Sequence, residues 1–335
     1  MILLHEQSIH YNTFMRKVLC GVDIGGTKLS TALVTQDGII LDKIFDCDHV
    51  DKPEAQLVEQ VAGNIKKLVR NNNLNESDLL GIGIGCAGHM RFRDGIVITT
   101  SNLKGFKNYP LRDTLQSYFS VPVILDNDAN AQAYGEFKFG AGKGYNDMVF
   151  LTISTGIGAG IIINNRLYRG TTGTAGEFGH TIVEPGSDLT CTCGNRGCLM
   201  ACACGMALPH LFEQKTRAGR ISLLNLPEPV DYTKINGKLL KQGLDMDDAV
   251  SKEIILDSGY YVGIGLYNIF QALNPPLIVL GGGLMSWGDF YLNQINKTFY
   301  ELARDMIFDP VEIKVSSIGA DAGIIGAASL ALELC

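Results

Sequence analysis

The stretch KVLCGVDIGGTKLSTALVTQDGIILDKIFDC, residues 17–47, has a pattern that recurs in the middle of the chain. Its β-branched runs predict three strands, at 18–23, 28–34 and 39–45, and QDG offers a hairpin turn between the last two. Residues 148–170, MVFLTISTGIGAGIIINNRLYRG, again predict a strand, a glycine-rich turn, a second strand and a further turn. A pattern that occurs twice predicts two lobes of similar fold.

Helices and strands alternate after each of these segments. From Pro53 onward apolar residues recur at helical spacing as far as Asn71–Asn73, and the apolar runs 79–86 and 121–126 predict strands buried on both faces. The second half continues with helix, strand, helix, strand and a last helix from Asp321. We therefore expect an α/β protein whose two lobes face one cleft, with each glycine-rich turn lining that cleft.

The expected division of the chain has three parts. Residues 1–16 form an N-terminal extension, residues 17–135 form the first lobe and residues 136–321 form the second. Residues 322–335 can pack back on the first lobe.

The composition is that of a globular protein with material for two cores. The chain has 335 residues, of which 46% are hydrophobic and 19% charged. Its formal net charge is −7, without a compensating basic run, and this disfavours nucleic acid as a partner. The apolar stretch 260–273 is too short to span a membrane, so we expect no membrane partner. Nine cysteines without an N-terminal export signal favour the reducing cytoplasm.

Three glycine-rich segments are candidates for binding a nucleotide. The candidate residues are Asp23, Gly25, Gly26, Thr27 and Lys28 in DIGGTK, Ser154, Thr155, Gly156 and Gly158 in STGIGAG, and Gly281, Gly282 and Gly283 in LGGG. Adjacent glycines expose backbone N–H groups, and Asp23 at the strand end is suited to hold Mg²⁺ through water. The first two turns occupy matching positions in the repeat, so we expect them to bind the two ends of a polyphosphate. The third can approach an adenosine or simply allow close packing of helix on strand.

The segments VDIGGTK, DNDANAQAYGEFKFGAGKG, TISTGIGAG, GEFGH and CTCGNRGC, in this order, resemble the ROK family. That family contains bacterial sugar kinases, sugar-responsive repressors and the kinase domain of an enzyme acting on N-acetylmannosamine. The resemblance covers about residues 17 to 333. It implies an actin-like ATPase fold of two ribonuclease H-like lobes, Mg·ATP as the phosphoryl donor, a structural zinc ion and a homodimer or homotetramer.

Asp128 follows a predicted strand and begins a predicted helix in LDNDAN, residues 125–130. An aspartate at this position can have no other role than to cap the helix, and this is one interpretation of Asp128. However, ligands of α/β proteins bind at the carboxyl ends of strands, and a kinase needs a carboxylate beside the attacking hydroxyl. The resemblance implies that Asp128 is the catalytic base and also contacts the substrate, as do Asn127 and Asn102. From the residues alone, Asn102 would pass for a turn residue.

A cluster of cysteines follows in HTIVEPGSDLTCTCGNRGCLMACACG, residues 180–205. His180, Cys191, Cys193 and Cys198 offer one imidazole and three thiolates, which favour tetrahedral Zn²⁺, and four protein ligands indicate a structural site. Cysteines separated by one residue rarely fit disulfide geometry. We expect Cys202 and Cys204 to be small buried residues instead.

Glu177 and His180 resemble the family's E-x-x-H sugar clamp. Otherwise Glu177 would be a solvated surface charge. Met200 departs from the family, whose sugar kinases usually have a glutamate there that holds sugar hydroxyls. Its presence indicates a deoxy sugar, a cyclitol or an acylated amino sugar as substrate, a loss of affinity, or a methionine that only packs.

The sequence therefore predicts an ATP-dependent kinase that phosphorylates a hydroxyl of a hexose, amino sugar or cyclitol. The alternatives are a sugar-sensing regulator that does not bind DNA and a kinase of an atypical polyol. Family repressors carry a DNA-binding domain before this core, and about 17 residues precede Val18 here, so we expect no such domain.

Overall fold

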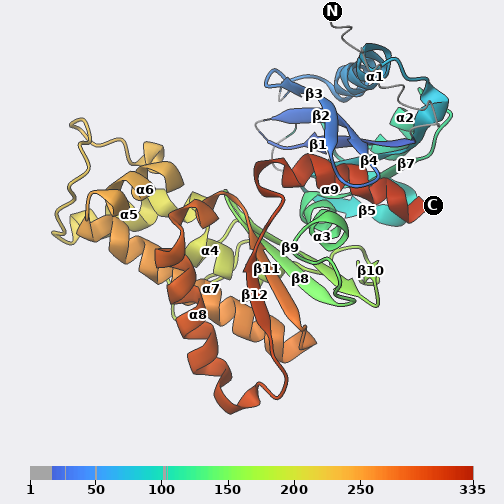
Figure 1. Ribbon diagram of the computed structural model, residues 1–335. Helices are drawn as coiled ribbons and strands as arrows, with labels where there is room; N and C mark the ends of the chain where they lie inside the picture. The colour runs from blue at the N-terminus through green and yellow to red at the C-terminus, as the bar shows by residue number, and fades with distance from the viewer. Residues whose placement is uncertain (1–16, 27, 50, 101–102, 104, 335) are drawn as a thin grey trace, which may run out of the picture.

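The computed structural model describes residues 17–334 apart from residues 27, 50, 101–102 and 104. The expected extension at residues 1–16 and the candidate site residues Thr27 and Asn102 lie outside the described residues. Two five-stranded sheets, one in each lobe, form the framework of the described chain (Figure 1).

The first sheet has the strand order β3-β2-β1-β4-β7. Its strands are β1 (Val18–Ile24), β2 (Leu29–Thr35), β3 (Ile40–Asp46), β4 (Leu79–Cys86) and β7 (Val123–Asn127). The strands β1 to β3 are antiparallel, as the hairpin turn predicts, whereas β4 and β7 run parallel to β1. Helices α1 (Glu54–Asn71) and α2 (Leu111–Gln116) bury their apolar residues against one face of this sheet.

The second sheet repeats the topology of the first, with the order β10-β9-β8-β11-β12. Its strands are β8 (Met148–Ile153), β9 (Ile157–Ile163), β10 (Arg166–Leu167), β11 (Leu277–Gly281) and β12 (Glu312–Val315). Again the first three strands are antiparallel, and the last two are parallel to β8. The expected duplication of an α/β lobe is therefore confirmed.

Two helices lie between the sheets (Figure 1): α3 (Asp128–Phe139) and α9 (Ala322–Leu330). Glycines let them approach closely, since a Cβ on Gly135 would lie only 2.8 Å from the Cα of Gly326. On the other side, α9 packs on β1, where a Cβ on Gly21 would lie 2.3 Å from the carbonyl oxygen of Ile324. The expected boundary at 135/136 falls inside the continuous helix α3, which also packs on β8 and β9.

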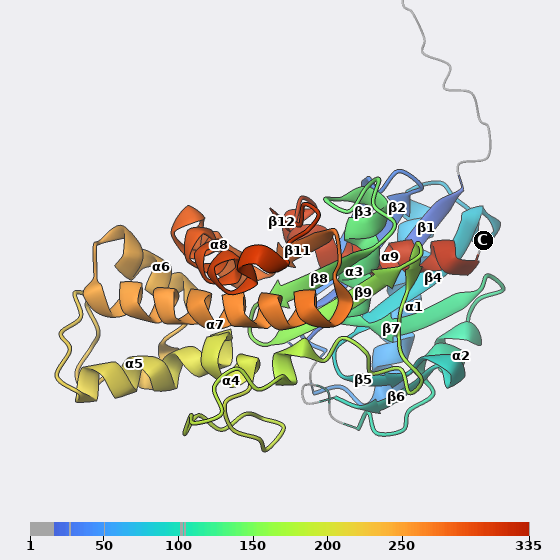
Figure 2. The same cartoon turned by 90° about the horizontal axis from the view of Figure 1, so that it is seen from below.

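The remaining helices belong to the second lobe. They are α4 (Leu199–Ala203), α5 (Leu208–Arg217), α6 (Gly237–Asp245), α7 (Ala249–Leu273) and α8 (Asp289–Ala303). The long helix α7 runs along this lobe with α5, α6 and α8 beside it (Figure 2). No helix of the described residues combines the length and apolarity needed to cross a membrane.

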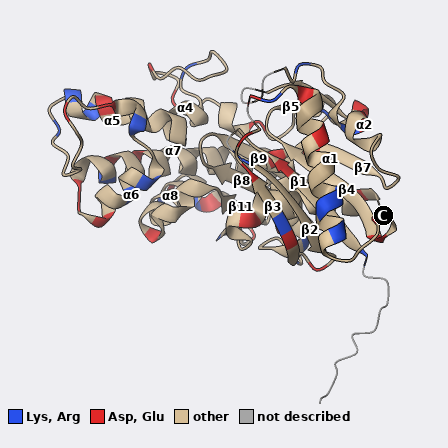
Figure 3. Cartoon of the chain, turned by 90° about the horizontal axis from the view of Figure 1, so that it is seen from above, with Lys and Arg blue, Asp and Glu red and all other residues tan. Residues whose placement is uncertain are grey.

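A small sheet of β5 (His89–Arg91) and β6 (Ile96–Thr99) belongs to the first lobe and follows β4. Along α1 the acidic residues lie in the first half of the helix and the basic residues in the second half (Figure 3). The strands β1, β4 and β7 are parallel and end on the same side of the sheet, and this edge supplies residues of the site.

Candidate active site

One cleft of about 1080 Å³ brings together residues from both lobes. Most of the residues predicted from the sequence line it: Asp23, Gly25, Gly26, Lys28, Asn127, Asp128, Ser154, Thr155, Gly156, Gly158, Glu177, His180, Gly281, Gly282 and Gly283. Thus all three glycine-rich segments face the same space as the candidate base.

The first glycine-rich turn joins β1 to β2. Gly25 N–H donates to the carbonyl oxygen of Lys28 at 3.0 Å, which closes the turn. Asp23 is buried at the end of β1, and its Oδ2 lies 3.5 Å from Lys28 Nζ. Burial raises the pKa of Asp23, while Lys28 opposes the rise. The fully buried His49 donates from Nε2 to the Gly25 carbonyl oxygen at 2.8 Å and so holds the turn from behind.

The second turn joins β8 to β9 and is supported by the segment after α4. Ser154 and Thr155 accept, through their carbonyl oxygens, hydrogen bonds from the backbone N–H groups of Gly205 and Met206 at 2.7 and 3.0 Å. A Cβ on Gly158 would lie 3.0 Å from the Cβ of Ala129, so this glycine lets β9 approach the start of α3. The second turn and the helix that bears Asp128 are therefore packed together.

The third segment follows β11. Gly282 has a φ of 93°, and a Cβ there would lie 2.3 Å from the carbonyl oxygen of Ile153. Close packing of the backbone thus accounts for Gly282. The segment also lines the cleft, and the binding of an adenosine beside it stays a prediction.

Asn127, rather than Asp128, is the N-cap of α3. Its side-chain oxygen accepts a hydrogen bond from Ala129 N–H at 2.8 Å, and its amide donates to the Gly88 carbonyl oxygen at 2.9 Å. The expectation that Asp128 occupies the cap position was therefore wrong by one residue. Asp128 begins the helix itself and accepts from Ala129 N–H at 3.0 Å.

The carboxyl group of Asp128 has an unusual environment. Burial and the nearby carboxylate of Asp23 raise its pKa to about 6, although backbone hydrogen bonds and the helix N-terminus favour the ionised form. A carboxylate with a pKa close to neutral can accept a proton at neutral pH and return it afterwards. This is a property expected of a general base.

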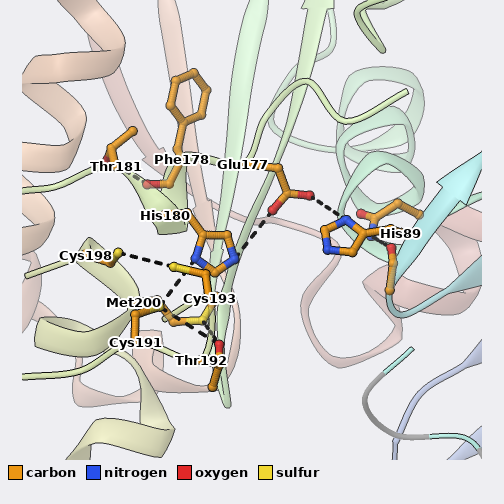
Figure 4. A network of polar contacts seen from close by, with 12 residues as sticks. His89, Glu177, Phe178, His180, Thr181, Cys191, Thr192, Cys193, Cys198 and Met200 are labelled. Atoms are coloured by element: carbon orange, nitrogen blue, oxygen red, sulfur yellow. Dashed lines mark hydrogen bonds and ion pairs between the residues drawn. The ribbon is translucent and has the colours of Figure 1, made fainter. Parts of the chain in front are cut away.

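Glu177 lines the cleft and lies between two imidazoles (Figure 4). Its Oε1 is 3.5 Å from Nδ1 of His89, and its Oε2 is 3.8 Å from Nε2 of His180. Glu177 also contributes to the raised pKa of Asp128, so the two carboxylates face a common space. A ligand with several hydroxyls could donate to Glu177 and accept from the histidines there.

The second ring nitrogen of His180 lies beside the cysteine cluster. Its Nδ1 lies 3.4 Å from Sγ of Cys191, while Sγ of Cys193 and Sγ of Cys198 are 3.7 Å apart (Figure 4). The donor atoms of all four residues lie within 4.8 Å of one another. Thiolates around a tetrahedral zinc ion are about 3.8 Å apart, so both the spacing and the donor set fit a metal ion. As expected, Cys202 and Cys204 are buried outside this cluster.

Met200 lies on α4 and belongs to two environments. It packs against the core of the second lobe, and it lines both the cleft and an adjoining hollow of about 340 Å³. Its Sδ lies 3.8 Å from Oγ1 of Thr192, and its methyl carbon lies 3.5 Å from the position of a Cβ on Gly156. The side chain therefore borders the site rather than being enclosed in the core.

The arrangement can be compared with known proteins. The sequence profile of the ROK family matches residues 19–334. The chain belongs to the ROK family. Its two-lobed architecture is the actin-like ATPase fold that the resemblance implies.

Among the relatives of this chain, a glucokinase from Halalkalibacterium halodurans is 34% identical over 91% of this chain and 92% of its own. A ROK family glucokinase from Streptomyces griseus, solved in complex with glucose and AMPPNP, is 31% identical. It has a TM-score of 0.78, with 94% of this chain and 99% of that chain covered. A xylose repressor from Bacillus spizizenii is 31% identical, over 93% of this chain and 76% of its own length.

Three residues near the site of this ROK chain were not predicted. His49 supports the first turn, His89 contacts Glu177, and Arg169 pairs with Asp126 two residues before the candidate base. Each acts across a long separation in sequence and stands in no recognisable local pattern.

Proposed function

We propose that this chain is an ATP-dependent carbohydrate kinase that transfers the γ-phosphoryl group of Mg·ATP to a hydroxyl of a sugar or sugar-like substrate. The observation that carries the proposal is the single cleft in which both phosphate-binding turns, Asp128 and Glu177 meet. The glucokinases among its relatives support the same activity.

In this proposal the ATP phosphates lie against the turns at residues 23–28 and 154–158, and the adenosine lies toward residues 281–283. Asp23 and the backbone N–H groups face the phosphates, and Asp23 would hold Mg²⁺ through water. The ion would neutralise charge on the phosphates. Lys28 balances the buried carboxylate of Asp23.

The acceptor sugar lies between Asp128 and Glu177. The attacking hydroxyl donates its proton to Asp128, whose raised pKa suits it to accept one. Asn127 keeps one amide N–H beyond its contact with Gly88 and can donate it to a second hydroxyl. Closure of the lobes would exclude water, which otherwise competes with the sugar as acceptor.

We also propose that His180, Cys191, Cys193 and Cys198 bind a structural Zn²⁺. With four protein ligands the ion would have no open position for chemistry. Its effect on the site would come through His180, because binding at Nδ1 leaves Nε2–H directed to the space beside Glu177.

The substrate remains a class rather than a single sugar. A glutamate in place of Met200 would add a charge-assisted hydrogen bond, and such a bond is worth about 1.5–3 kcal/mol. Its absence favours a substrate with no hydroxyl at that point, such as a deoxy sugar, a cyclitol or an acylated amino sugar.

ADP release measured with Mg·ATP and a panel of hexoses, amino sugars, deoxy sugars and cyclitols tests the proposal. At least one acceptor should raise ADP release well above the rate with water alone. No acceptor-dependent release across the panel, from a chain that binds nucleotide, would refute kinase activity.

The second candidate is a sugar-responsive regulator, favoured by the match to xylose repressors. It predicts sugar binding without turnover.

We further propose a cytoplasmic homo-oligomer, because thiolate ligands require a reducing compartment and the family resemblance implies a dimer or tetramer. Light scattering of the purified chain measures its oligomeric state, and a gel shift with upstream DNA tests whether a regulator of this kind binds DNA.

A further inference from the structure

Arg169, in the segment after β10, forms an ion triad with residues from the first lobe. Its Nε lies 2.6 Å from Oδ2 of Asp126, and its Nη2 lies 2.5 Å from Oε2 of Glu333. The guanidinium also stacks over the ring of Phe92, with its carbon 3.8 Å from the ring centroid. These partners come from β7, from the C-terminal segment and from the turn after β5, so one side chain joins three separate parts of the first lobe.

The triad is largely removed from solvent. The side chains of Arg169 and Asp126 are only 14% and 2% exposed. Buried ion pairs of this kind must be well oriented to offset their desolvation, and the planar fork of arginine meets two carboxylates in fixed directions. Arg169 therefore fixes the relative positions of the two carboxylates, in addition to balancing their charge.

Asp126 in turn forms hydrogen bonds with the start of the helix that carries Asp128. Its second oxygen, Oδ1, accepts hydrogen bonds from the backbone N–H of Asn127 at 2.7 Å and from the side chain of Asn130 at 2.9 Å. Both donors belong to the cap and first turn of α3, and this turn carries Asp128. The Arg169–Asp126 pair thus sets the position of the turn from which the base projects.

At its other end Arg169 is fixed to the loop that leads to Glu177. Its carbonyl oxygen accepts from Ala175 N–H at 3.1 Å, which closes the loop two residues before Glu177. A Cβ on Gly173 would lie 3.0 Å from the carbonyl oxygen of Met90, so the loop also lies against the first lobe. A single residue consequently anchors the loop that bears Glu177 and the strand that leads to Asp128.

We infer that Arg169 is a positioning residue for phosphoryl transfer, which holds the loop of Glu177 and the turn of Asp128 in register across the two lobes. The inference rests on the proposed kinase activity. The hydrogen bonds of Arg169 described above lead to Asp128 and Glu177, in the sugar half of the site, and are not made to the three nucleotide-binding segments.

The test is Arg169→Met, which keeps an unbranched side chain in place of the arginine stem but removes the charge and the planar fork. We expect kcat to fall about tenfold or more and the sugar KM to rise, because small misplacements of reacting groups are costly. The dissociation constant of a fluorescent ATP analogue should stay unchanged. Arg169→Lys, which can meet one carboxylate but not both, should recover part of kcat. Arg166→Met, an exposed position on β10, is the matched control and should behave like the wild-type chain.

Amide hydrogen exchange supplies a readout that does not depend on activity. Residues 168–177 should exchange faster in Arg169→Met than in the wild-type chain, whereas the turn at residues 23–28 should not. If the variant does not fold, Glu333→Gln removes one arm of the triad and should give a smaller change of the same kind.

A wild-type kcat in Arg169→Met, or a loss of nucleotide affinity in step with kcat, would overturn the inference, because the residue would then be dispensable or merely structural. A wild-type chain without turnover on any sugar would instead refute the proposed function. In that case the exchange experiment still decides whether Arg169 holds the loop.

Discussion

Asn127 caps helix α3 through its side chain, so the adjacent Asp128 is not required for capping. Of these two consecutive residues, Asn127 has the structural role and Asp128 is free for the chemical one. It also allows Asp128 to be changed without removing the helix cap.

We expect Asp128→Asn to lower kcat at least about a hundredfold, because asparagine cannot accept the proton of the attacking hydroxyl. Nucleotide affinity should be almost unchanged. Coupled ADP release and binding of a fluorescent ATP analogue measure the two effects. Asp113→Asn on α2, where the acid is exposed, is the control. Unchanged turnover in Asp128→Asn would remove this residue from the role of base.

The pKa of Asp128 gives a prediction for the pH profile. The base must be ionised, and burial with Asp23 nearby raises its pKa to about 6. As pH falls through about 6 the fraction of ionised Asp128 falls, so kcat/KM should drop about tenfold per pH unit below that value and level off above it. Initial rates between pH 4.5 and pH 8 would show this. A flat profile down to pH 5 would contradict the assignment.

The cysteine cluster predicts a metal-dependent sugar site. Cys198→Ser should remove a bound zinc ion, lower Tm by about 5 °C or more and raise the sugar KM, while nucleotide affinity changes little. Zinc analysis by mass spectrometry, thermal melting and kinetics provide the measurements. Cys202→Ser, at a buried cysteine outside the cluster, should retain zinc. Equal zinc content in the two variants would exclude Cys198 as a ligand.

Met200 predicts a change of preference. In Met200→Glu we expect the KM for unsubstituted hexoses to fall about tenfold to a hundredfold, since the carboxylate would accept hydrogen bonds from sugar hydroxyls. Met200→Gln, of similar size but uncharged, should give a smaller effect. The acceptor panel used for the wild-type chain measures both. Identical preferences in all three proteins would mean that Met200 only packs.

Much of the fold could be predicted from the sequence because its strands are continuous apolar runs. The segments predicted at 18–23, 28–34 and 39–45 became β1, β2 and β3 with shifts of one residue at their ends. The repeat of this pattern indicated the second sheet. Helices α5 and α6 were not predicted, because they have only 10 and 9 residues and so their apolar residues repeat over few helical turns.

Residues of the cleft could be predicted from the sequence where they belong to a recognisable turn or to a set of ligands with a typical spacing. The cysteine cluster and the glycine-rich turns are of this kind. The Arg169–Asp126 pair spans 43 residues, and the Arg169–Glu333 pair spans 164. Such contacts are created by tertiary folding, and neither partner carries a local signal. The one-residue error at Asn127 and Asp128 has a similar cause, because both residue types can cap a helix.

The position of α9 has a consequence for synthesis of the protein. This helix is synthesised long after β1 and β2, yet it covers Leu19, Ala32 and Val34 on these two strands. While the ribosome is still translating the second lobe, these three residues lack the helix that covers them. The nascent chain must therefore keep this apolar surface shielded until α9 emerges, and a product truncated before Ala322 would be a substrate for chaperones and proteases.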